Sequence, residues 1–186
     1  MNERYYMACL DLRARRCVVV GGGAVGLEKA QGLLACGAAV TVVAPEVVPQ
    51  FHELDVVWRP RTYRARHLSG AFLVVAATSQ RHVNERVHDD AEARGMLCNV
   101  ADVPDLCNFI LPAVHREGPI AVAVSTGGAS PALAKRIRRE VAAMVGPQHA
   151  ALARRLFALR PEAKRRYATY AERRDYFDAL VEEALR

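Results

Sequence analysis

Long apolar runs and an export signal are both missing from this sequence. None of its hydrophobic stretches approaches the roughly 20 residues that a membrane-spanning helix requires. The N-terminal segment MNERYYMACL does not have the charged-then-apolar order of a secretory signal. These two absences predict a chain that neither crosses a membrane nor is exported.

Paired cysteines and metal-ligand spacings are also lacking. Five cysteines are an odd set without a Cys-x-x-Cys motif, which favours reduced thiols in the cytoplasm over a disulfide framework. Neither they nor the six histidines have the spacing of a zinc site, so we expect no metal centre. With 186 residues, 52% of them hydrophobic and 25% charged, the chain is long enough for one domain with an appendage or for two small domains. The cysteines are Cys9, Cys17, Cys36, Cys98 and Cys107.

The excess of basic over acidic residues is confined to the last third of the chain. Residues 1–130 hold 13 basic and 13 acidic residues, whereas residues 131–186 hold 13 basic and 7 acidic ones, which accounts for the whole net charge of +6. A basic tail indicates a polyanionic partner, either a nucleic acid or a small molecule with many acidic groups. The alternative is a solvated helical face with no ligand.

A glycine-rich loop follows the most apolar strand candidate. Residues 17–26 read CVVVGGGAVG, which predicts a buried parallel strand that turns into the N-terminus of a helix. In the pattern Gly21-x-Gly23-x-x-Gly26, the first glycine permits the turn and the second lets a pyrophosphate approach the backbone. The third lets helix and strand pack closely. Because a helix start also attracts anions, the loop predicts a dinucleotide site.

The segment after this loop completes a strand–helix–strand unit. Apolar spacing predicts a helix over 24–34, Gly37 fits the left-handed position that ends it, and 39–44 reads as a second buried strand. The acidic residue that bonds the adenosine ribose usually closes this strand. Here Glu46 comes slightly late, so its carboxylate or the backbone of Pro45 and Glu46 takes that role. Because no arginine stands there for a 2′-phosphate, NAD is favoured over NADP.

Further alternating elements extend the predicted sheet. The hydroxyls of Thr78 and Ser79 are candidate caps for the helix that follows them. The predicted elements are strands at 56–59, 71–77 and 97–100, and a helix at 83–94 that closes at Gly95.

Asp102 follows the last of these strands. Ligands of open α/β sheets sit at the carboxyl ends of the strands, so this aspartate is a candidate catalytic carboxylate. A capping or turn role is the alternative.

Residues from 108 onward depart from the strand–helix rhythm. They predict two or three antiparallel strands with a turn at Gly118, in a second unit that starts near residue 112. Ser130 and Pro131 then have the pattern of an N-cap and first helical residue. The helix that begins at Pro131 is expected to end near 146–147, and two further helices are expected at 150–159 and 161–185. At the other end of the sequence, residues 4–10 are expected to form a short leading strand or arm.

Several motifs together resemble the precorrin-2 dehydrogenase family, which includes the N-terminal part of bifunctional sirohaem synthase. They are the glycine-loop segment, AATSQRHVNERV, LCNVADVPDLCNFILPA, AVSTGGASPALAKRIR and YAERRDYF. The resemblance implies NAD-dependent oxidation of precorrin-2 to sirohydrochlorin by a homodimer, and some members also insert Fe²⁺. It implies an α/β chain with a Rossmann-type parallel sheet (1–112), a small α+β dimerisation domain (113–147) and an α-helical tail (148–186).

The same resemblance suggests roles for individual residues. The family's catalytic aspartate falls on Asp102. Independently of the resemblance, His115 is the nearest rival base, although a histidine on a strand before a hairpin is more often structural. Where many relatives have Val-Ser-Ser-Gly-Gly, this chain has Ser125 and Thr126, so a hydroxyl is kept with an added methyl group. The predicted NAD-binding residues are Gly21, Gly22, Gly23, Ala24, Val25, Gly26, Pro45, Glu46 and Thr78. The predicted residues for the polycarboxylate substrate are Thr126, Gly127, Gly128, Ser130, Arg136 and Arg139.

Two other functions use part of the same pattern. An NAD-sensing regulatory module also begins with a strand, a glycine loop and a helix, but it needs neither Asp102 nor a basic tail. A nucleic-acid binder is suggested only by the basic tail and predicts an affinity that falls steeply with salt. We therefore expect no nucleic-acid partner.

Overall fold

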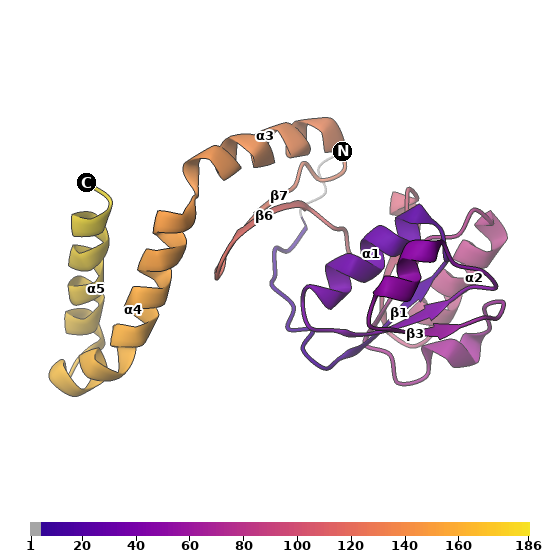
Figure 1. Ribbon diagram of the computed structural model, residues 1–186, viewed down its shortest axis with the longest axis horizontal. Coiled ribbons are helices and arrows are strands. Elements are labelled where there is room, and N and C mark those ends of the chain that lie inside the picture. Colours follow the sequence, from indigo (N-terminus) through magenta and orange to yellow (C-terminus); the bar gives the residue numbers. More distant parts are fainter. Residues whose placement is uncertain (1–4) are drawn as a thin grey trace. The chain divides into compact units, whose positions relative to one another are not determined.

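The structure, a computed structural model, describes residues 5–186 and divides them into two compact units. The first comprises residues 5–110 and the second residues 111–186. Figure 1 shows the sheet with its helices in the first unit, and a hairpin followed by α3, α4 and α5 in the second. The predicted fold class is thus confirmed.

A five-stranded parallel sheet forms the centre of the first unit. Its strand order is β3-β2-β1-β4-β5. Strands β2 and β3 are added on one side of β1, and β4 and β5 on the other, so the strand order reverses between β1 and β4. Clefts at such a reversal point are where open α/β sheets bind ligands. The strands are β1 Arg16–Val20, β2 Ala39–Val43, β3 Val56–Arg59, β4 Leu73–Ala76 and β5 Leu97–Val100.

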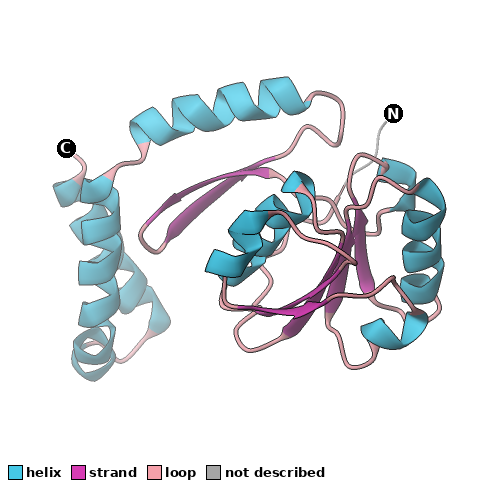
Figure 2. Cartoon of the chain, turned by 45° about the vertical axis from the view of Figure 1, so that its right-hand side comes forward, coloured by secondary structure: helices cyan, strands magenta, loops and turns pink. Residues whose placement is uncertain are grey.

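Helices cover both faces of this sheet (Figure 2). Strand β1 alternates between two cores: Val18 and Val20 pack with residues of α2 (Arg81–Glu92), whereas Cys17 and Val19 pack with residues of α1 (Ala24–Leu34). Burial on both faces explains why its sequence is continuously apolar rather than alternating. Short 3-10 turns are found at Pro49–Glu53, Ala65–Leu68 and Pro104–Leu106.

The second unit begins with an antiparallel hairpin. Strands β6 (Ala113–Glu117) and β7 (Ile120–Val124) pair around a turn at Gly118, which has φ of 54°. Helix α3 (Pro131–Met144) packs on both strands. The Ser130 side chain accepts a hydrogen bond from the Leu133 N–H at 3.2 Å, as the predicted N-cap should. The division into a dimerisation domain and a helical domain stays a prediction.

The boundary between the last two helices lies later in the chain than the predicted position near residue 160. Helix α4 runs over Pro147–Arg166 with Pro161 inside it, and α5 covers Tyr170–Ala184. Pro161 is exposed, so the bond lost with its missing N–H leaves no buried polar group, and the helix continues. The actual boundary is made by Thr169, whose side chain accepts from the Glu172 N–H at 3.2 Å in a capping box.

Of two smaller expectations, one was wrong and one is narrowed. The N-cap of α2 is Gln80, without a capping side chain, rather than Thr78 or Ser79. Residues 5–10 form no strand, so of the two alternatives for residues 4–10 only the leading arm remains, and Arg4 lies outside the described residues.

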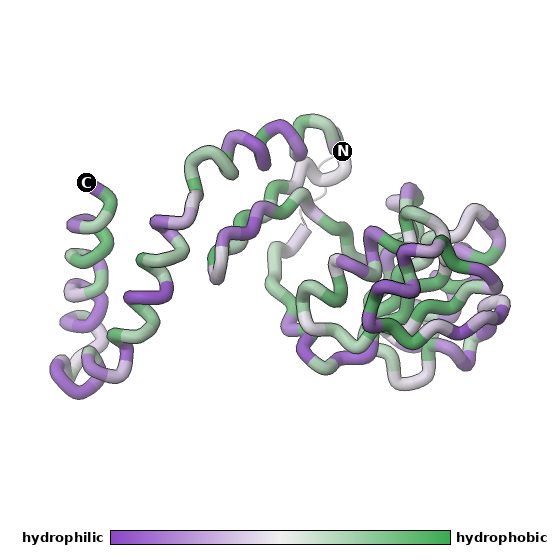
Figure 3. Tube along the Cα trace, in the orientation of Figure 1, coloured by the Kyte–Doolittle hydropathy of each residue, from purple (hydrophilic) through white to green (hydrophobic). Residues whose placement is uncertain are grey.

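The distribution of hydropathy differs between the units. In Figure 3 the strands of the five-stranded sheet are mostly hydrophobic, whereas α3, α4 and α5 alternate between hydrophilic and hydrophobic turns. Within residues 5–186, no helix combines the length and apolar character needed to cross a membrane. None of the five cysteines, all of which lie within the described residues, forms a disulfide. Burial raises the pKa of Cys17 to about 11 and that of Cys98 to about 12, so both thiols keep their protons at neutral pH.

Candidate functional site

A cleft of about 650 Å³ opens at the carboxyl ends of the central strands. The glycine loop after β1, the segment after β2, the segment after β4 and the turn after β5 all line it. It brings together almost all of the predicted cofactor residues and the predicted catalytic one. These are Gly21, Gly22, Gly23, Ala24, Val25, Pro45, Glu46, Thr78 and Asp102.

Two glycines of the loop serve close packing within the protein. A Cβ on Gly21 would lie 2.3 Å from the Ala77 carbonyl oxygen, and Gly21 has φ of 126°, which side chains rarely adopt. A Cβ on Gly26 would lie 2.3 Å from the Gly21 carbonyl oxygen. Gly26, which was predicted to bind the cofactor, does not line the cleft and instead allows close packing within the protein.

Gly22 and Gly23 differ in what surrounds them. A Cβ on Gly22 would lie 2.0 Å from the Glu46 carbonyl oxygen, and the Val48 N–H donates to the Gly22 carbonyl at 2.8 Å. A Cβ on Gly23 would meet nothing within 4 Å, and its φ of −81° suits any residue. The protein itself therefore does not require glycine at position 23, where the loop faces the cleft. This open space fits the close approach of a pyrophosphate.

The first turn of α1 is equally suited to an anion. Its N-cap, Gly23, supplies no capping side chain, and no acidic residue stands in the first turn. The N–H groups there have no partner within the helix and carry the positive end of its dipole. The residues present thus fit the phosphates of a dinucleotide.

Matched alanine variants should separate the two neighbouring glycines. Gly22→Ala should lower the free energy of unfolding by about 1–3 kcal/mol, because backbone atoms at 2.0 Å must move apart. Gly23→Ala should change it by less than about 1 kcal/mol, since its Cβ enters open space. Urea unfolding of both variants measures the difference, and equal losses would contradict the assignment.

The segment after β2 is fixed by the neighbouring strand. The Trp58 Nε1–H donates to the Ala44 carbonyl at 3.0 Å, and the Ala44 N–H donates to the Arg59 carbonyl at 3.3 Å. Pro45 and Glu46 follow directly, and both are exposed at the cleft. The late acidic residue thus lies at the cleft in spite of its shifted position.

Thr78 is held by a residue that the sequence analysis missed. The buried Asn84 accepts from the Thr78 hydroxyl at 2.7 Å and N–H at 3.2 Å, and donates to the Thr78 carbonyl at 3.0 Å. The signal was present, because Asn84 shares the buried face of α2 with Val87 and Ala91. A polar residue on that face needs a partner, and here the partner is the end of β4.

Asp102 occupies an unusual backbone conformation. It lies in the turn Val100–Val103, closed by a 3.3 Å hydrogen bond from the Val103 N–H to the Val100 carbonyl, and its φ is 60°. Glycine or asparagine is the usual residue at such a position, and aspartate tolerates it better than most. Its side chain is exposed at the cleft.

The rival base, His115, has a structural partner. Its Nε2 lies 2.9 Å from the Val145 carbonyl oxygen at the end of α3. Because a carbonyl only accepts, Nε2 carries the hydrogen and ties the hairpin to that helix. This contact disfavours His115 as the base.

The predicted substrate residues belong to the second unit. Thr126 Oγ1 accepts from the Ser130 N–H at 3.0 Å, so the threonine performs this local role as a serine would. Gly127 and Gly128 have φ of 61° and 84° and form the turn between Thr126 and Ser130. On α3, the Arg136 guanidinium pairs with the Glu140 carboxylate at 2.7 Å.

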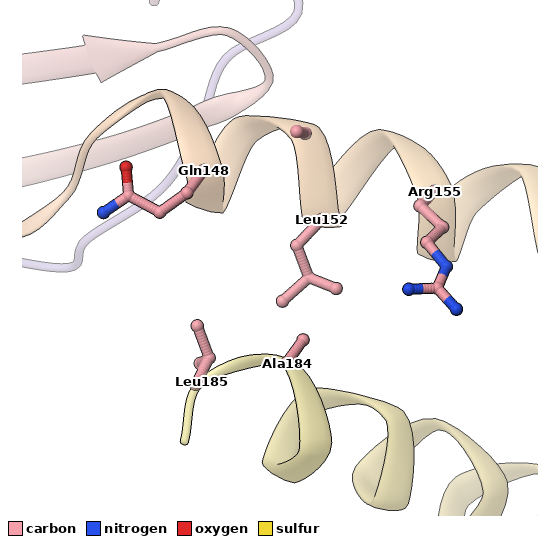
Figure 4. Close-up of a pocket in the computed structure, with 6 residues that line it drawn as sticks. Gln148, Leu152, Arg155, Ala184 and Leu185 are labelled. Carbon is pink, nitrogen blue, oxygen red and sulfur yellow. The ribbon is translucent and has the colours of Figure 1, made fainter.

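A smaller cavity lies between α4 and α5 (Figure 4). It measures about 240 Å³ and is lined mainly by apolar groups and one charged side chain, Arg155. Across residues 5–186, no group of three or more histidine, cysteine or acidic residues is placed to hold a metal ion. The cleft of the first unit, which is lined by the glycine loop, Glu46, Thr78 and Asp102, is therefore the candidate functional site.

The sheet order, the glycine loop and the uncapped helix start define an NAD(P)-binding protein of the Rossmann type. Comparison with known families agrees. The chain belongs to the family described as "Putative NAD(P)-binding", which matches residues 8–113, and residues 117–144 match the family "Sirohaem biosynthesis protein central".

Individual relatives carry the same two segments. A "Siroheme synthase" from Chromobacterium violaceum is 38% identical over 185 residues, which is 97% of this chain and 39% of that protein. One from Salmonella paratyphi A is 40% identical over 175 residues, 90% of this chain and 38% of that protein. The chain thus spans less than half the length of these relatives.

A solved structure is similar over most of its own length as well as over most of this chain. The protein titled "SirC, precorrin-2 dehydrogenase" aligns with a TM-score of 0.79 and 28% identity, covering 95% of this chain and 89% of that one. The fold of 95% of this chain is therefore shared with that protein.

Proposed function

We propose that this chain oxidises precorrin-2 to sirohydrochlorin with NAD as the hydride acceptor. The observation that carries the proposal is that Asp102 and the open face of Gly23 line one cleft. The structural match to a precorrin-2 dehydrogenase and the siroheme synthase relatives support this choice of substrate.

The residues of the cleft divide the work of binding and proton transfer. Bound NAD supplies the chemistry of a hydride acceptor. The glycine loop and the N-terminus of α1 hold the pyrophosphate, and Glu46, through its carboxylate or its backbone with Pro45, bonds the ribose. Thr78 contacts the cofactor from the end of β4.

Asp102 acts as the general base. Oxidation removes a hydride and a proton from adjacent atoms of the substrate and leaves a double bond. Bound NAD would accept the hydride, and the Asp102 carboxylate accepts the proton. The base needs only to lie at the cleft in a fixed orientation, and the turn after β5 provides this.

The basic second unit recognises the carboxylates of the substrate. Thr126, Gly127, Gly128 and the N-cap Ser130 directly precede α3, whose dipole favours anions at this end, and Arg136 and Arg139 lie further along the helix. We also propose that the chain works as a cytoplasmic homodimer through the predicted domain at 113–147. Size-exclusion chromatography with light scattering tests this, and a monomer at micromolar concentration would contradict it.

Neutralising two arginines of α3 tests the substrate assignment. Arg136→Gln with Arg139→Gln should raise the KM for precorrin-2 about 100-fold and the KM for NAD by less than twofold, since each of the two arginines loses a charged hydrogen bond that contributes about 1.5 kcal/mol. Lys164→Gln with Arg165→Gln near the end of α4 removes the same charge as a control. Equal effects of both pairs would show only a loss of general positive potential.

Anaerobic turnover with precorrin-2 tests the function itself. The purified chain, NAD and precorrin-2 should give NADH, seen by absorbance, together with sirohydrochlorin. An NAD-sensing module would bind NAD without forming NADH. That outcome would overturn the proposal while leaving the NAD(P)-binding family intact.

A further inference from the structure

The turn that carries Asp102 is held together by a cysteine side chain. Cys107 Sγ accepts from the Val100 N–H at 3.1 Å and from Asn99 Nδ2 at 3.5 Å. It also lies 3.3 Å from the carbonyl oxygens of Val100 and Val103. Its single S–H can donate to either of them, one at a time. One sulfur atom thus connects the residues on both sides of Asp102.

The position of the sulfur is itself fixed by the following residue. The Asn108 N–H donates to the Cys98 carbonyl at 3.1 Å, and Asn108 Oδ1 accepts from the Cys98 N–H at 2.8 Å. Asn108 Nδ2 also donates to the Met96 carbonyl at 2.8 Å. Asn108 therefore binds the returning chain to the edge of β5, and the Cys107 side chain is anchored with it.

A third contact holds the middle of this loop. His88 on α2 lies with Nδ1 at 3.0 Å from the Leu106 carbonyl oxygen, which makes Nδ1 the donor. Burial raises the pKa of the Cys107 thiol above its usual value and outweighs the opposing effect of the Val100 N–H. The thiol consequently keeps the proton that it donates.

These contacts have a consequence for the carboxylate. A residue with positive φ other than glycine is strained and persists only where its surroundings impose that conformation. The closing backbone bond of the turn, at 3.3 Å, is long, so the sulfur contacts are a major part of what holds Asp102 at φ of 60°. We propose that Cys107 is a positioning residue that orients the Asp102 carboxylate in the cleft.

The proposal rests on the proposed function and predicts a specific kinetic pattern. Cys107→Ala should lower kcat for precorrin-2 oxidation about 10- to 100-fold, the loss expected when a catalytic group is misplaced by about 1 Å. The Kd for NAD should stay within twofold of the wild type. Cys107→Ser, which keeps a donor and an acceptor, should restore kcat to within about threefold of wild type.

Matched variants separate positioning from simple loss of packing. Cys17→Ala removes the same atom from a fully buried site on β1, in the other core of the sheet from Cys107, and it should leave kcat within twofold of wild type. Cys107→Val fills the volume of the sulfur and replaces the alanine variant if the latter does not fold. In an Asp102→Asn background, Cys107→Ala should have less than a twofold further effect, because it acts through the carboxylate.

A measurement without substrate distinguishes failure of this proposal from failure of the proposed function. In amide hydrogen exchange, the Val103 N–H should exchange at least about tenfold faster in Cys107→Ala and at the wild-type rate in Cys17→Ala. If the wild type does not oxidise precorrin-2, the proposed function fails, and this exchange rate alone decides the role of Cys107. An unchanged exchange rate, or a kcat within twofold of wild type for Cys107→Ala, would overturn the positioning role.

Discussion

Asp102→Asn should lower the rate of precorrin-2 oxidation by about 10²- to 10⁴-fold, the range that a general base contributes. Asparagine is the best test residue because it tolerates the positive φ of 60° at this position, so the turn stays intact. It keeps the shape of the carboxylate and removes its ability to take a proton. Asp102→Ala should lose as much activity and in addition some stability, because alanine tolerates that backbone conformation poorly.

The control for this result is another acidic residue in the same loop. Asp105 is exposed in the 3-10 turn Pro104–Leu106 and does not line the cleft. Asp105→Asn removes the same charge close by and should keep kcat within twofold. NAD affinity should be unchanged in both variants. Full turnover by Asp102→Asn would exclude this carboxylate as the base.

Gly23→Val should weaken NAD binding by at least about 100-fold, because its side chain occupies the space required by the pyrophosphate. The protein should still fold, because a Cβ at this position meets nothing within 4 Å and the extended backbone suits valine. Isothermal titration with NAD measures the affinity, and thermal unfolding checks the fold.

A second valine variant shows whether the effect is local. Gly32 lies on the exposed side of α1, where a Cβ also meets nothing within 4 Å, and it does not line the cleft. Gly32→Val adds the same side chain to the same helix and should bind NAD as the wild type does. Undiminished NAD affinity in Gly23→Val would refute the placement of the phosphates.

The elements of the first unit could be predicted because short-range patterns determine them. Strand β1 is apolar throughout because both of its faces are buried, and α1 starts and ends at the expected residues. The Ser130 cap of α3 and the hairpin before it also follow from local signals. The proline rule failed at Pro161, because an exposed proline in a long helix costs less than the tertiary packing of that helix contributes.

The residues that support the site could not be predicted in the same way. Asn84 and Cys107 act on Thr78 and on the turn of Asp102 through contacts that exist only after α2 and β5 have packed. Spacing in the sequence identifies groups that line the cleft, such as Gly23, but not the groups that hold them in place. Those depend on the register between elements, which a single sequence does not contain.

The most direct test of the proposed activity is the stoichiometry of one anaerobic reaction. Wild-type protein with excess NAD and a limited amount of precorrin-2 should form NADH and sirohydrochlorin in equal amounts until the substrate is consumed. Asp102→Asn protein should bind NAD equally well and form almost none of either product in the same time. Tight NAD binding by the wild type without formation of NADH would contradict the account.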